Sequence, residues 1–204
     1  MYPRMFKIRQ QLDKMIVSDI TMAVKTEFRK SRLSSLIKPG SKVAITAGSR
    51  GITDIVPIIS SLVKEIQSRK GNPFIIPAMG SHGEATADGQ LQILFDYGIK
   101  EDIIGCPIVS SMDVIKLGET RTGIPVLLDR HACSSDHIIV LNRVKSHTEF
   151  HGQIESGLMK MIVIGLGKHQ GAITAHRFAV KYGYERTITE MGMCALEKAP
   201  IALG

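Results

Sequence analysis

The chain has 204 residues, of which 44% are hydrophobic and 22% charged, the ordinary composition of a globular protein large enough to bury a core. No apolar run reaches the ~18 residues that cross a bilayer, and charges fill the N-terminus where a secretion signal would be apolar, so we expect a cytoplasmic protein without membrane contact. The net charge of +7 comes from scattered Lys and Arg with few aromatic residues, which argues against nucleic acid as a partner.

The first predicted element is helical, because apolar residues recur every three to four positions over 8–36, as in one long helix or two shorter ones. The predicted strands then cover 43–47, 74–78, 107–111, 114–118, 124–128 and 137–144, and the predicted helices cover 54–69, 87–97, 169–182 and 185–198. This alternation, with Gly- and Ser-rich loops after strands, predicts a single α/β domain over residues 1–204. Its sheet is expected to be Rossmann-like, mostly parallel and flanked by helices.

Ligands of such sheets bind beyond the carboxyl ends of the strands. Three segments that carry ionisable side chains among small residues follow predicted strands or extend from one: AGSRG (47–51), MGSHGE (79–84) and NRVKSHTEFHG (142–152). We therefore expect all three to share the edge of the sheet where a ligand would bind.

The first two segments each offer one candidate side chain. Arg50 lies in a glycine loop after a strand, where a guanidinium can hold a carboxylate or phosphate with two hydrogen bonds; the alternative is a surface arginine. The loop lacks the third glycine of a dinucleotide fingerprint and is no P-loop. His82 occupies the same position one strand–loop–helix unit later, so both could face one cleft, although a lone loop histidine is more often structural.

The third segment places Arg143, Lys145, His147, Glu149 and His151 at alternate positions, which would share a face on an extended chain. Such a density of proton-transfer and anion-binding groups is unusual. Metal binding through the two histidines is an alternative, but the HExxH motif of zinc proteases is absent.

Lys160 follows Ser-Gly and precedes the aliphatic run MIVIGLG. Partial desolvation there would lower its pKa and make it a candidate nucleophile or cofactor tether. The alternative is a lysine whose ammonium reaches solvent past a buried stem.

Taken together, these motifs resemble the N-terminal domain of the nickel-dependent lactate racemase family, over about residues 38–200. The strongest match is SGLMK followed, after KMIVIGLGKHQGAITA, by a histidine 16 residues beyond the lysine. The resemblance implies that Lys160 tethers a nickel-pincer nucleotide, the nickel complex of pyridinium-3,5-bisthiocarboxylic acid mononucleotide. It also implies that His176 is the protein ligand of the nickel.

Other positions follow the family in order along the chain. The resemblance implies that Arg50 binds the substrate carboxylate, that His82 is one catalytic histidine, and that a second is His147 or His151. His147 is preferred because KSHTEF is the closer match. The sequence departs from the family where Ala47 replaces an aspartate that helps position substrate, which puts lactate itself in doubt. Family proteins are about twice as long, so we expect a C-terminal domain, absent from this chain, to complete the cleft with a further lysine.

The resemblance thus implies a racemase or epimerase of a small 2-hydroxy acid. One histidine removes the hydroxyl proton while the α-hydride moves to the pyridinium ring, and the hydride returns on either face of the keto acid. Inversion requires a base on each side, expected at His82 and His147. Two alternatives stay open: a non-catalytic anion-binding domain of the same fold, and a hydrolase whose metal is bound by His147, His151 and His176.

Overall fold

A parallel β-sheet forms the centre of the protein, seen in a computed structural model that describes residues 5–9, 16–147 and 151–204. In the described part of the chain this sheet has four strands, in the order β2-β1-β5-β6. Their bounds are β1 (Lys42–Ala47), β2 (Asn72–Pro77), β5 (His137–Ile139) and β6 (Ile201–Leu203). Every neighbouring pair is parallel, which confirms the predicted α/β class.

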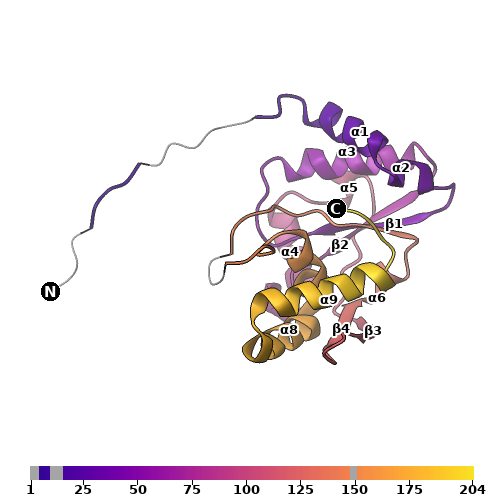
Figure 1. Ribbon diagram of the computed structural model, residues 1–204. Helices are drawn as coiled ribbons and strands as arrows, with labels where there is room; N and C mark the ends of the chain where they lie inside the picture. The colour runs from indigo at the N-terminus through magenta and orange to yellow at the C-terminus, as the bar shows by residue number, and fades with distance from the viewer. Residues whose placement is uncertain (1–4, 10–15, 148–150) are drawn as a thin grey trace.

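Helices cover both faces of the sheet (Figure 1). One face carries α1 (Ile20–Lys30), α2 (Leu33–Leu36), α3 (Ile55–Gln67), α4 (Ala87–Asp96) and α5 (Glu101–Ile104). The other carries α6 (Arg130–Cys133), the π-helix η2 (Met161–Gly165), α8 (Lys168–Tyr182) and α9 (Tyr184–Lys198). Side chains of β1 alternate between the two cores, with Val43 and Ile45 on the α3 side and Ala44 on the α8 side, as the two-residue period of a strand requires.

The helix predicted over 8–36 is wrong at residues 8–9 and 16–19, and residues 10–15 lie outside the described part of the chain. Helix α1 begins only at Ile20, after Asp19, whose carboxylate accepts a hydrogen bond of 2.9 Å from the backbone N–H of Met22. Residues 5–9 and 16–19 are not helical, and Phe6 and Ile8 are 83% and 87% exposed. The apolar spacing has no core to face there, and periodicity without a packing partner does not hold a helix.

Two predicted strands do not join the parallel sheet. β3 (Val114–Glu119) and β4 (Pro125–Asp129) pair antiparallel with each other and pack beside α9. Only residues 120–124 separate them, whereas a parallel connection needs a dozen or more residues. The strand predicted at 107–111 is also wrong, because Ile108 forms only an isolated bridge to Ile75.

The strand predicted at 137–144 is too long, since β5 ends at Ile139. The backbone N–H of Leu141 donates to the hydroxyl of Thr46 over 2.9 Å instead of continuing the ladder with β1. Strand β6, which pairs with β5, was not predicted. The two last helices are confirmed, and Gly183, with φ of 81°, separates them. Among the described residues, no helix is long and apolar enough to span a membrane.

Candidate functional site

The three predicted segments follow neighbouring strands of the sheet. The loop after β1 carries Arg50, the loop after β2 carries His82, and the segment after β5 carries His147. Because β1 lies between β2 and β5 and all three are parallel, their carboxyl ends meet at one edge. The expectation that these segments share an edge is confirmed, and Arg50 comes from the middle strand of the three.

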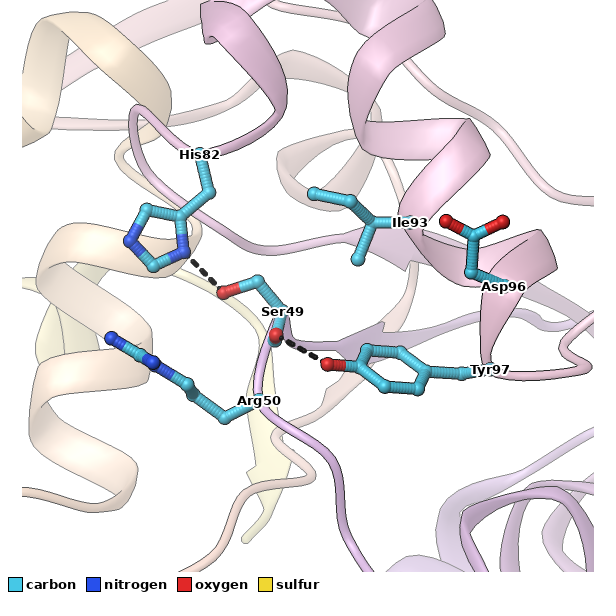
Figure 2. A pocket seen from close by; sticks show the side chains of 6 residues that line it. All are labelled: Ser49, Arg50, His82, Ile93, Asp96 and Tyr97. Atoms are coloured by element: carbon cyan, nitrogen blue, oxygen red, sulfur yellow. Dashed lines mark hydrogen bonds between the residues drawn. The ribbon is translucent and has the colours of Figure 1, made fainter.

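A pocket of about 420 Å³ opens beside the first two loops (Figure 2). It is lined by Ser49, Arg50, His82, Ile93, Asp96 and Tyr97. The Ser49 hydroxyl is hydrogen-bonded to Nδ1 of His82, and the Tyr97 hydroxyl donates to the backbone carbonyl of Ser49 over 2.9 Å. The side chains of Arg50 and His82 extend to the same side of Ser49, away from Tyr97. A basic group and an imidazole therefore face one space.

The His82 loop is held from α4 by a side chain that the sequence did not single out. The Gln90 amide is buried and donates to the carbonyl oxygens of Gly80 and His82, over 2.9 and 3.2 Å. Gly83 has φ of +65°, and a Cβ atom there would lie 2.6 Å from the backbone nitrogen of Gln90, so the loop and α4 approach too closely for another residue. His82 is thus positioned through its backbone as well as its ring.

Burial lowers the pKa of His82 below its ordinary value of 6.5, and the positive charges of Arg50 and Lys160 lower it further, in that order. His82 is therefore neutral at neutral pH and can accept a proton. The charge of Lys160 thus acts on His82, although the two residues belong to distant parts of the sequence.

A second group joins Lys160, His147 and His176 through Tyr184. The Lys160 ammonium donates to Nε2 of His147 over 3.0 Å. The rings of His147 and Tyr184 are stacked, with centroids 6.2 Å apart. The Tyr184 hydroxyl lies 2.9 Å from Nδ1 of His176, and the two rings meet edge to face at 5.7 Å. The structure therefore brings together three predicted site residues, whereas Tyr184 was missed because nothing in its sequence surroundings marks it.

The backbone from Lys160 to His176 turns a corner. α7 (Leu158–Lys160) begins after Gly157 and runs into η2, where the N–H of Leu166 bonds to the carbonyl of Met161, five residues back, over 2.9 Å. Lys168 then has φ of +54° and starts α8. π-turns are rare in proteins, and those that occur are often found at functional sites.

His151, the alternative second histidine, has different partners from His147. Its side chain is 90% exposed, and Nδ1 lies 3.4 Å from a carboxylate oxygen of Glu155. Glu155 also accepts the backbone N–H of His147 over 2.7 Å, which is the largest cause of its lowered pKa. Between Asn142 and His147 the chain forms only an isolated bridge from Lys145 to Ser156, and Glu149, with the rest of 148–150, lies outside the described residues.

A buried ion pair lies beneath the His82 loop. The Lys168 ammonium is 3.2 Å from the Asp129 carboxylate, and both side chains are fully buried. Lys168 also donates to the carbonyl of Pro77, the last residue of β2. Burial lowers the pKa of Lys168, and Asp129 opposes this shift. The pair ties β4 and α8 to the strand end that leads to His82.

No group of three or more His, Cys, Asp or Glu side chains that could hold a metal ion occurs among the described residues. The hydrolytic centre considered on His147, His151 and His176 therefore lacks the required grouping there. Lys160 and His176 offer one amine and one imidazole, which are linked through His147 and the half-buried Tyr184.

A family model described as the lactate racemase N-terminal domain matches residues 6–187, a span that includes every candidate residue named above. A search of curated proteins finds no match to the chain.

Proposed function

Since the chain belongs to the lactate racemase family through its N-terminal domain, we propose that it forms part of an isomerase that racemises or epimerises a 2-hydroxy acid. The observation that carries this proposal is the contact series Lys160–His147–Tyr184–His176, at the same edge of the sheet as the pocket of Arg50 and His82. The family match alone supports only the kind of enzyme; the contacts support roles for individual side chains.

We propose that Lys160 tethers a nickel-pincer nucleotide and that His176 binds its nickel. The half-buried position of Lys160 at the end of α7 favours attachment, because the amine is held in place by His147 rather than free in solvent. When bound, this group supplies the site that takes up the substrate α-hydride and gives it back.

Arg50 holds the substrate carboxylate in this proposal, with the two-pronged contact that a guanidinium offers. Its strand, β1, lies between β2 and β5, whose following segments carry His82 and His147. A substrate anchored at the middle strand therefore has one imidazole on each side. One histidine takes the hydroxyl proton as the α-hydride leaves, and the other returns a proton after the hydride has come back on the opposite face.

His82 suits the role of base because its lowered pKa keeps it neutral. Its Nδ1 is bonded to Ser49, which leaves Nε2 for the substrate hydroxyl. His147 is the second base in preference to His151, because His147 contacts Lys160 while His151 points to solvent. We propose further that a second domain of the family type covers the exposed Arg50, His82 and His176 and adds a catalytic lysine.

The proposal is tested by producing the protein with and without the enzymes that synthesise the pincer nucleotide, and measuring bound metal and intact mass. Nickel together with a mass adduct on Lys160, only when those enzymes are present, is the expected result. Lys160→Ala should lose the adduct, whereas Lys145→Ala, which removes an exposed lysine of the segment after β5, should keep it. His176→Ala should keep the adduct and lose the nickel.

Two other outcomes correspond to the alternatives. Zinc bound regardless of the synthesis enzymes would support a hydrolytic metal site, and no metal with no adduct would support an anion-binding domain. Interconversion of enantiomers, followed by chiral chromatography over a panel of 2-hydroxy acids, then identifies the substrate. Lactate need not be the best of them, because Ala47 stands where the family has its substrate-positioning aspartate.

A further inference from the structure

Tyr184 contacts both the proposed metal ligand, His176, and the second proposed base, His147. It is the first residue of α9, placed there by the turn at Gly183, and its side chain is partly buried. Its hydroxyl is within 2.9 Å of Nδ1 of His176, and its ring stacks on His147. A single side chain therefore contacts both functional groups by different means.

The hydrogen bond bears on which nitrogen of His176 can bind a metal. A neutral imidazole carries its proton on one nitrogen and a lone pair on the other. When a hydrogen-bond acceptor holds the proton on Nδ1, the lone pair is on Nε2, which is how most metal-binding histidines are prepared by a neighbouring group. A phenol oxygen can serve as that acceptor.

We propose that Tyr184 is a positioning residue, which accepts the Nδ1 proton of His176 and so presents the bare Nε2 of that ring to the nickel. This inference rests on the proposed function, because it takes His176 as the ligand. The edge-to-face contact of the two rings, at an interplanar angle of 76°, restricts rotation of the imidazole in addition to fixing its tautomer.

The stacking on His147 gives Tyr184 a second consequence. The phenol ring contacts both the proposed ligand and the proposed base, so its placement bears on the position of each imidazole. Tyr184→Phe removes the hydroxyl and retains the ring. It should therefore affect the tautomer of His176 while leaving the position of His147 largely unchanged.

The test follows the ring nitrogens of ¹⁵N-histidine-labelled protein by NMR and, in cofactor-loaded protein, the rate at which a chelator removes nickel. The wild type should show His176 protonated on Nδ1, and Tyr184→Phe should shift it towards a mixture of tautomers. The same variant should release nickel roughly 10–100-fold more readily, the usual effect of losing a group that orients a metal ligand. Tyr182→Phe is the matched control, since Tyr182 stacks on Phe178 and should change neither result.

The outcomes separate this inference from the proposed function. Wild-type His176 protonated on Nε2, or nickel release from Tyr184→Phe at the wild-type rate, would overturn the role of Tyr184. Nickel retained by His176→Ala would instead remove His176 as the ligand, and the proposed function would fail at that point. The NMR measurement needs no cofactor, so it reports on the hydrogen bond in either case.

Discussion

Replacement of Lys168 by methionine should destabilise the protein strongly, although Lys168 is not among the proposed catalytic groups. The substitution keeps the length and apolar stem of the side chain and removes the charge. It leaves the carboxylate of Asp129 fully buried without its cationic partner, and the carbonyl of Pro77 without its donor. A buried charge without a counter-charge is the costly part of such a change.

The size of the effect follows from the burial. Both side chains have no exposed surface, so water cannot screen the remaining charge. Removal of one partner from a buried ion pair costs about 3–5 kcal/mol. For a protein of this length each kcal/mol corresponds to about 2–4 °C in Tm, so Tm should fall by about 6–20 °C.

Thermal and urea unfolding followed by circular dichroism measure this loss. A second substitution, Asp129→Asn, removes the unpaired negative charge. Its amide oxygen can still accept the backbone N–H of Ala132, which lies 2.8 Å from the carboxylate in the wild type. The double variant should therefore be more stable than Lys168→Met alone. Lys181→Met, at the exposed end of α8, should change the free energy of unfolding by less than about 0.5 kcal/mol. If Lys168→Met unfolds within about 1 kcal/mol of the wild type, the buried pair does not have the energetic role assigned to it.

Three further predictions concern the site. Arg50→Lys should raise KM for the 2-hydroxy acid, because a single ammonium cannot reproduce a two-pronged contact; unchanged kinetics over a panel of such acids would exclude Arg50 from substrate binding. His82→Ala and His147→Ala should each lower kcat/KM by roughly 10²–10⁴-fold in both directions of the isomerisation, measured on cofactor-loaded protein. His151→Ala should lower kcat/KM far less. A larger loss from His151→Ala than from His147→Ala would mean that the second base is misassigned. The pKa of His82 measured by NMR should lie below 6.5, so activity that needs its neutral form is lost only as the pH falls through that lowered pKa. Arg50→Gln removes one of the positive charges and should raise the midpoint part of the way back. A wild-type midpoint at or above 6.5 would contradict this.

The loops of the site could be predicted from the sequence because their geometry follows from local rules. A short apolar run, a glycine-rich turn and a helix recur around Arg50 and His82, and parallel strands bring such turns to one edge. The proposed tether and metal ligand required the family resemblance, since nothing in the local pattern links Lys160 to His176.

The missed residues owe their roles to contacts between distant segments. Gln90, Tyr184 and Lys168 are an amide, a phenol and an amine in unremarkable helical sequence, and only the packing of α4, α9 and α8 gives each its partner. The antiparallel pairing of β3 and β4, in contrast, could have been predicted from the sequence. The few residues that connect them are too short for a parallel crossover.

The spacing between Lys160 and His176 has a meaning that follows from the corner described above. On a straight α-helix, 16 residues would separate the two by about 24 Å. Here the π-turn and the positive φ at Lys168 interrupt the helix between the two residues. Lys160 contacts His147 and His176 contacts Tyr184, which stacks on His147, so the interval joins two groups that a straight helix would hold apart. Loss of one residue from the π-turn would restore ordinary helix and swing Lys160 by about 100° around its axis, so insertions and deletions should be tolerated less in this interval than most substitutions are.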